Sequence, residues 1–135
     1  MPAPKGWGYS SGKSGRASVP AFLKDEVATR AHALGEQVLK PRYVQPPETP
    51  QFNYVVDVYI RWVQGRLYFV AAYNCPEPGA PQPCFEVRCA RLTYAGNNRF
   101  NLAFMRHTGQ WVEPYTDLTL DECLTSIRDD PFFAP

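Results

Sequence analysis

The hydrophobic residues of this chain repeat with two different periods, and the change between them constrains the fold more than any other feature. Before the proline-rich stretch 41–50, apolar residues recur every three or four positions at Leu23, Val27, Ala31, Leu34 and Val38. After it, apolar residues alternate with others at Tyr54, Val56, Val58, Ile60 and Trp62. The first period is typical of an amphipathic helix and the second of a half-buried strand. One long helix is therefore predicted to precede a series of strands.

The predicted helix has a start signal and a stop signal. Ser18 is placed to cap its first turn, which contains Pro20. At the other end, Pro41 disfavours the helical conformation of Lys40. We therefore expect the helix to end near Leu39.

Four to five strands are predicted after the connector. The turn Gln64-Gly65 joins the first two as a hairpin. The apolar phase slips within the third, so a bulge is expected near Ala90. A fourth strand covers Phe100 to Met105, and a short fifth lies around Trp111 and is ended by Pro114.

The end of the chain predicts a second, short helix. Thr119 and Glu122 have the spacing of a capping box, with apolar residues following at helical intervals. The whole pattern is α+β: a long N-terminal helix packed on an antiparallel β-meander of four to five strands, then a short C-terminal helix.

Composition separates a tail from a single domain. Residues 1–18 are basic and rich in Gly and Ser, which predicts disorder, and residues 19–135 hold the helix and strand patterns. No run of 18 apolar residues occurs, so no membrane span or membrane partner is expected. The start of the chain also lacks the apolar stretch of a signal peptide, which favours a cytoplasmic location.

The four cysteines are predicted to be reduced and to be small buried hydrophobic residues. Their spacing is irregular and only two histidines are present, so no metal site and no cofactor are expected. Cys75 and Cys84 bracket the proline-rich loop 76–83. A redox-dependent bridge between them across a hairpin is the alternative interpretation.

Several segments carry a resemblance to a known family. The most distinctive are Phe85-Glu86, Ala90-Arg91, Arg99-Phe100-Asn101-Leu102 and the run from Met105 to Trp111. On these, residues 20–135 resemble a family of small bacterial proteins that is a domain of unknown function. The resemblance implies a bacterial, cytoplasmic, globular domain, and it supplies no activity or catalytic residue.

One candidate site is the turn after the fourth strand. His107 could act there as a general base beside Arg106, with Glu113 or Asp57 orienting its ring. The alternative is that these side chains only brace the turn. No recognised catalytic motif occurs in the chain, so the sequence leans against an enzyme.

A second candidate is the sheet face that the long helix does not cover. Strand alternation places aromatic and arginine side chains there, which gives the binding candidates Tyr59, Arg61, Arg66, Tyr68 and Arg88. Trp111, near the turn that holds Arg106 and His107, is a further binding candidate. The acidic residues Asp57 and Glu86 are expected on the same face, as are the aliphatic residues Val55, Val63, Val70 and Met105.

Three functions compete for these residues. A homodimer through the second sheet face is favoured, because one helix cannot cover its aliphatic residues. An alternative is single-stranded nucleic-acid binding by stacking on the tyrosines, which the net charge of +1 does not favour. The second alternative is a small enzyme or ligand-binding cleft around Arg106, His107 and Trp111.

Overall fold

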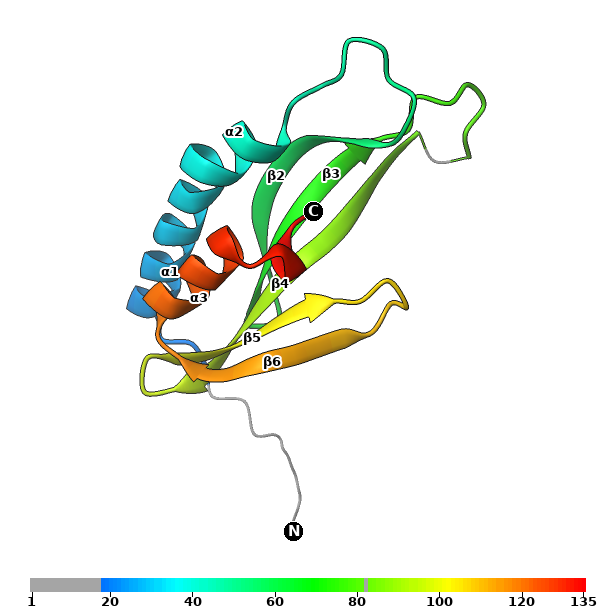
Figure 1. The fold of residues 1–135 in the computed structure, drawn as a ribbon. Coiled ribbons are helices and arrows are strands. Elements are labelled where there is room, and N and C mark those ends of the chain that lie inside the picture. Colours follow the sequence, from blue (N-terminus) through cyan, green and yellow to red (C-terminus); the bar gives the residue numbers. More distant parts are fainter. Residues whose placement is uncertain (1–17, 82) are drawn as a thin grey trace.

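The computed structural model describes residues 18–81 and 83–135, in which helices pack on one face of an antiparallel sheet (Figure 1). The N-terminal helical segments are α1 (Ala21–Leu34), η1 (Gly35–Leu39) and α2 (Lys40–Tyr43). The strands are β2 (Tyr54–Val63), β3 (Arg66–Asn74), β4 (Cys84–Gly96), β5 (Arg99–Met105) and β6 (Trp111–Leu118). They are followed by α3 (Leu120–Asp129) and η2 (Pro131–Phe133). The α+β prediction is confirmed. The tail predicted for residues 1–18 lies outside the described residues except for Ser18.

The N-terminal helix differs from its predicted bounds at both ends. It begins at Ala21 with Pro20 at the capping position, so the prediction that Ser18 caps it is wrong. The structure has no side-chain cap there, and the Pro20 carbonyl accepts from the Lys24 N–H at 2.9 Å. The predicted stop near Leu39 is also wrong, because helical structure continues to Tyr43.

A π turn explains how the helix passes Pro41. In a regular helix the proline ring clashes with the carbonyl four residues earlier. Along η1 the helix is wider, and the Lys40 N–H bonds to the carbonyl of Gly35, five residues back. Pro41 then lies in the first turn of α2. The extra residue also rotates the helix, so that Leu39 is buried while Val38 is only half-buried.

The strands follow one another in the sheet in the order β2-β3-β4-β5-β6, which is the predicted meander. Each tight turn uses left-handed backbone, with φ of 52° at Gln64 and 78° at Gly65 in the β2–β3 turn. The predicted bulge near Ala90 is confirmed, because Ala90 pairs with Phe69 and Arg88 with Val70, leaving Cys89 unpaired.

A second bulge, in β2, changes which side chains face the helices. The register shifts between Val55 and Asp57. Val55 packs against the core and Val56 is exposed, the reverse of the predicted placement of both residues. Asp57 was expected on the far face, but it forms an ion pair with Lys40 of α2 at 3.2 Å.

β6 is longer than predicted and does not stop at Pro114. Among the described strands it is the last of the sheet, so its outer backbone groups have no ladder partner there to lose. A proline is tolerated at such an edge, because its missing N–H breaks no hydrogen bond within the sheet.

The C-terminal helix is fixed by the predicted capping box. The Glu122 N–H donates to the Thr119 hydroxyl, and the Thr119 N–H donates to the Glu122 carboxylate at 2.9 Å. The chain then turns back through η2, which buries Phe133 against the core and leaves Phe132 exposed.

The core lies between the helices and the sheet. It is built from apolar residues of α1, the strands and α3, and its largest fully buried side chains include Leu67, Leu92, Phe100 and Leu102. Within the described residues, no helix combines the length and apolar character that a membrane crossing requires.

Candidate functional site

The sheet face opposite the helices is the main candidate site, and we call it the arginine face. β2 contributes Tyr59 and Arg61, and β3 contributes Arg66, Tyr68 and Val70, with side chains directed away from the core by strand alternation. The other members are Arg88, Arg91 and Thr93 of β4, Ala103 of β5, and Trp111 and Glu113 of β6.

The small and aliphatic side chains of this face are already buried in the single chain. Val70 and Ala103 are 0% exposed and Tyr68 is 5% exposed, although none of them belongs to the core beneath the helices. The long arginine and aromatic side chains of the face cover them instead. The aliphatic surface that suggested a homodimer is therefore smaller than the sequence implied, because Val70 is not accessible.

Each aromatic ring of the face supports a guanidinium group. The Arg88 guanidinium carbon lies 4.5 Å from the ring centre of Tyr68, and that of Arg91 lies 4.7 Å from the Trp111 ring. The Tyr68 and Trp111 rings are themselves 5.7 Å apart. Such cation–π contacts hold the guanidinium groups over the rings, where their N–H groups can still donate hydrogen bonds.

One arginine of the face is neutralised within the chain. Arg61 donates to both carboxylate oxygens of Glu86, at 2.9 and 2.8 Å, in a bidentate pair. The Tyr59 hydroxyl donates to the same carboxylate. This edge of the face therefore offers little free positive charge.

The centre of the face is different, because polar atoms there are buried without partners. In the described residues, Nε of Arg66, Nε of Arg91 and the hydroxyl of Thr93 have no hydrogen-bond partner. The register places them together: Arg66 pairs with Thr93, and Tyr68, two residues along β3, pairs with Arg91. The strands thus gather two guanidinium donors and one hydroxyl in one partly buried cluster.

Charge accumulates in this cluster. Burial lowers the pKa of the Arg91 guanidinium, and the nearby Arg66 charge lowers it further. Arg91 has one acidic neighbour, Glu113, at 3.8 Å. Among the described residues, Arg66 and Arg88 form no ion pair. These unpartnered atoms are buried, so an anion bound here would first meet the outer N–H groups of the guanidinium groups, and its charge would reduce the repulsion between the arginines.

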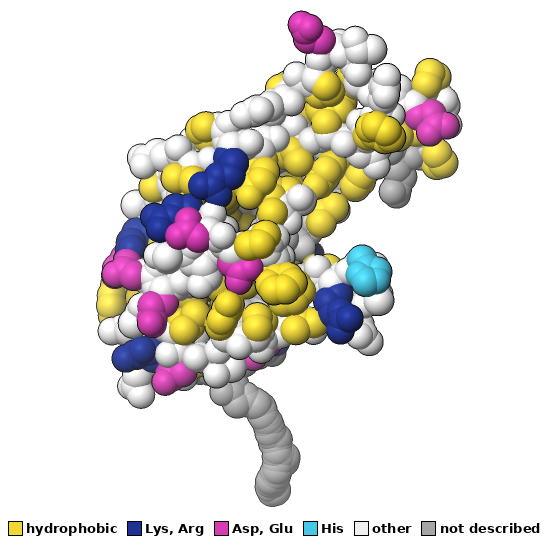
Figure 2. Space-filling view, in the orientation of Figure 1, with side chains coloured by type: hydrophobic (Ala, Val, Ile, Leu, Met, Phe, Trp, Pro, Cys, Tyr) yellow, Lys and Arg dark blue, Asp and Glu magenta, His cyan; other side chains and the backbone are white. Residues whose placement is uncertain are grey.

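The turn between β5 and β6 holds the other candidates. Arg106 and His107 are exposed beside a cavity of about 460 Å³, which is also lined by Phe104, Met105, Val112, Pro131 and Phe132. Hydrophobic side chains gather on this side of the molecule, between α3 and the β5–β6 hairpin (Figure 2).

The acidic residues expected to orient His107 lie elsewhere. Glu113 contacts Arg91 on the arginine face, and Asp57 pairs with Lys40. Within the described residues, no hydrogen bond joins His107 to a carboxylate. Trp111 does not line the cavity either, since its ring packs against Tyr68. The structure therefore places His107 at the turn but brings neither of the expected orienting acids to it.

The cysteines are free thiols in the structure, but the prediction that all four are buried is wrong: Cys89 and Cys123 are buried, Cys75 is half-buried, and Cys84 is exposed at the start of β4 beside the loop. Cys84 pairs with Asn74 and donates to its side chain, while the Cys75 N–H bonds to the Pro83 carbonyl. Successive residues of a strand point to opposite faces, so the two thiols are directed apart and the alternative of a bridge is not supported. The described residues hold no cluster of three or more potential metal ligands.

Two residues of the central cluster were missed by the sequence interpretation, namely Arg91 and Thr93. The bulge that the sequence predicts near Ala90 could have identified both residues. One unpaired residue reverses the alternation, so that Arg91 and Thr93 share a face with Arg88.

Comparison with known proteins adds a family but no function. The model of a family described as Domain of unknown function (DUF3024) matches residues 19–135. No curated protein and no solved structure gives a significant match to the chain.

Proposed function

The chain belongs to the DUF3024 family, and because that family is described without a function, we propose one from the geometry of this chain. The domain binds single-stranded nucleic acid along the arginine face, with the phosphates of the strand held by Arg66, Arg88 and Arg91. The observation that carries the proposal is the pair of neighbouring, partly buried arginines whose Nε atoms have no partner in the described residues.

Unpartnered buried donors favour an anion as the ligand. A buried N–H without an acceptor costs about 1–3 kcal/mol, which an oxyanion recovers when the arginine side chains shift and expose their buried Nε–H groups to it. A guanidinium binds phosphate through two parallel N–H donors, and contacts with the rings of Tyr68 and Trp111 already position two guanidinium groups on this face.

The arrangement of the arginines favours an extended chain of phosphates over a single one. Arg91 and Arg66 lie on adjacent strands two residues out of register, a diagonal of about 7–8 Å. Arg88 continues the same direction along β4, beyond the bulge. A single strand lying along this diagonal brings successive phosphates to successive arginines.

The rings of the face support this mode of binding better than base stacking. Guanidinium groups already lie over the rings of Tyr59, Tyr68 and Trp111. The surface offered to a ligand is therefore a layer of guanidinium groups, and any base that stacks does so on an arginine plane. Affinity is expected to depend mainly on salt and only slightly on base sequence.

Fluorescence anisotropy with a labelled oligothymidine strand tests the proposal. Three phosphate contacts on a single strand predict a slope of log K against log salt of about −2. Arg66→Ala should raise Kd about tenfold, equivalent to about 1.4 kcal/mol, and should reduce that slope. Arg128→Ala removes the same charge from α3 on the other side of the sheet and is the matched control. Equal affinities of the two variants would overturn the proposal.

The homodimer through this face stays a prediction, as do the bacterial origin and the cytoplasmic location. The accessible residues that could form the homodimer interface are Tyr59, Arg61 and Glu86, whereas Val70 is buried. Native mass spectrometry at high protein concentration tests it, because Tyr59→Glu should convert a dimer mass to that of the monomer, whereas a monomeric wild type would contradict it.

A further inference from the structure

The cavity beside the β5–β6 turn combines an apolar wall with two basic side chains, and strand binding on the arginine face does not use it. Its volume of about 460 Å³ lies within the range of small-molecule sites. The apolar lining residues are Phe104, Met105, Val112, Pro131 and Phe132, and the basic ones are Arg106 and His107. None of the seven lining residues is acidic, so the cavity is complementary to a ligand with an apolar body and a negative charge.

Two stacked phenylalanine rings form part of the apolar wall. The rings of Phe104 and Phe132 are nearly parallel, with an angle of 15° between their planes and 4.9 Å between their centres. Phe104 is half-buried against the core, whereas Phe132 is 66% exposed. An exposed ring that is stacked on one side can accept a second flat ring on the other.

Hydrogen bonds hold this wall in place. The Asp130 carboxylate accepts from the Phe132 N–H and from the Tyr115 hydroxyl, both at 3.0 Å. The buried ring of Phe133 packs edge-on against Phe104, with 5.9 Å between the ring centres. The wall therefore requires little ordering when a ligand binds. Asp130 does not line the cavity, so its charge does not lie against the ligand.

Strand alternation places Arg106 on the same side of the hairpin as the apolar wall. Phe104 pairs with Val112 across β5 and β6. The pairing continues beyond the strands, because the Arg106 N–H donates to the Gln110 carbonyl at 2.8 Å. Arg106 lies two residues after Phe104, so the two side chains belong to one face. Within the described residues, Arg106 and His107 form no ion pair.

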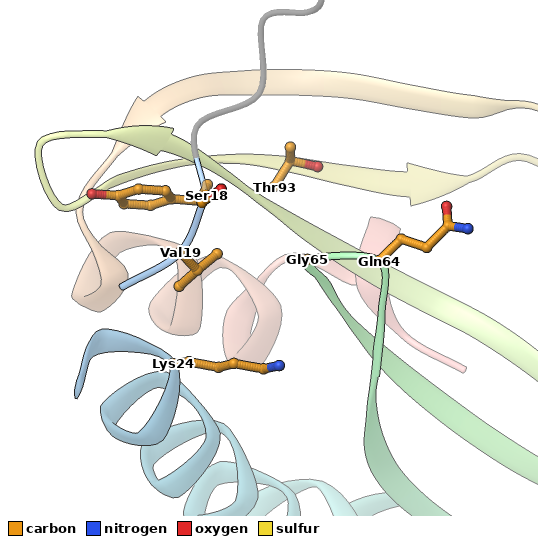
Figure 3. A pocket seen from close by; sticks show the side chains of 7 residues that line it. Ser18, Val19, Lys24, Gln64, Gly65 and Thr93 are labelled. Carbon is orange, nitrogen blue, oxygen red and sulfur yellow. The ribbon is translucent and has the colours of Figure 1, made fainter. Parts of the chain in front are cut away.

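The pocket at the start of α1 lacks this convergence. It has a volume of about 350 Å³ and is lined by Lys24, Gln64 and Thr93 among others. Figure 3 shows the Gln64 and Thr93 side chains pointing away from Lys24. Its polar groups therefore do not form one binding site. Of these two hollows, the cavity at the β5–β6 turn is the one that combines an apolar wall with a positive charge.

From this combination we propose that the cavity at the β5–β6 turn binds a small aromatic carboxylate, with its ring stacked on Phe132 and its carboxylate bound by Arg106. A guanidinium binds a carboxylate through two parallel N–H donors, and such charged hydrogen bonds are about twice as strong as neutral ones. An uncharged aromatic molecule of the same shape lacks this pairing. An aliphatic acid lacks the ring that stacks. The ligand class is therefore a flat aromatic acid.

NMR titration of the backbone amides with 2-naphthoate and with 2-naphthamide tests the inference. The two probes share one ring system and differ in charge. The wild type should bind 2-naphthoate about tenfold more tightly than 2-naphthamide, a difference of about 1.4 kcal/mol. The amide signals of Arg106 and Phe132 should shift as either probe binds. Equal affinities for the two probes, or binding of neither at millimolar concentration, would overturn the inference and leave the proposed function standing.

Variants separate the two contacts. Arg106→Gln should remove the preference for 2-naphthoate, and Arg99→Gln, which makes the same change at the exposed start of β5, should retain it. Phe132→Ala should weaken binding of both probes about three- to tenfold, because the stacked ring is lost. Phe52→Ala removes another exposed ring, outside the cavity, and should leave both affinities unchanged. A preference that survives in Arg106→Gln, or is lost in Arg66→Gln instead, would place the carboxylate elsewhere and overturn the inference.

Discussion

Arg91→Met should make the domain more stable while it weakens binding of a single strand. Arg91 lies over Trp111 with a side chain that is 14% exposed, beside the like charge of Arg66. Its Nε is buried without a partner in the described residues. Replacing a residue that serves binding but destabilises the fold is expected to raise stability and weaken binding together.

The expected gain in stability follows from the contacts that change. Removing the unpartnered donor recovers about 1–3 kcal/mol. The lost cation–π contact with Trp111 is worth about 0.5–1 kcal/mol, and a methionine sulfur over the same ring replaces much of it. The pair with Glu113, at 3.8 Å, adds less than about 1 kcal/mol. The free energy of unfolding should rise by about 1 kcal/mol, which raises Tm by about 3–5 °C.

Chemical denaturation and anisotropy on the same samples check both effects. Arg128→Met is the control, because Arg128 is exposed and pairs with Asp129, and it should change stability by less than about 0.5 kcal/mol. A loss of stability in Arg91→Met larger than about 1 kcal/mol would refute the reasoning, since it would mean that the guanidinium stabilises the face.

Three further predictions concern the rest of the fold. Burial raises the pKa of Cys89 to about 11 and that of Cys123 to about 12, so iodoacetamide at about pH 8 should modify only the other two thiols of the native protein, as counted by mass spectrometry. Hydrogen bonds from Thr119 lower the pKa of Glu122 below its usual 4.5, so Glu122→Ala should reduce stability at neutral pH by an amount that shrinks as the pH falls through the lowered pKa in acid denaturation curves. Leu102→Ala should lower the free energy of unfolding by about 2–5 kcal/mol in urea, because Leu102 is 0% exposed in the core; a smaller loss would show that the site collapses around the cavity.

Local signals in the sequence were sufficient to predict the elements and their order. The turn at Gln64-Gly65 and the capping box at Thr119 act through adjacent residues, so they can be recognised without knowledge of the tertiary structure. The end of the first helix could not be predicted in this way. A proline normally ends a helix, and only the π turn before Pro41 allows this one to continue.

The sequence predicted several of the residues on the arginine face, but it did not predict which of them would be buried at its centre. Alternation placed Arg66 and Arg88 on one face, and the structure places them there. The burial of Tyr68 and Val70 on a face without helices depends on how long side chains from neighbouring strands lie across them, and no periodicity encodes that. The pairing of each arginine with a carboxylate also depends on the folded sheet, so it could not be predicted from the sequence pattern.

NMR of the arginine Nε–Hε groups during titration with an oligothymidine strand tests the central claim most directly. The account predicts that the Nε–Hε signals of Arg66 and Arg91 shift together as the strand binds, because these two groups gain acceptors. The signals of Arg106 at the β5–β6 turn and of Arg128 on α3 should stay in place. Binding that shifts Arg106 and leaves Arg66 and Arg91 unchanged would contradict the account.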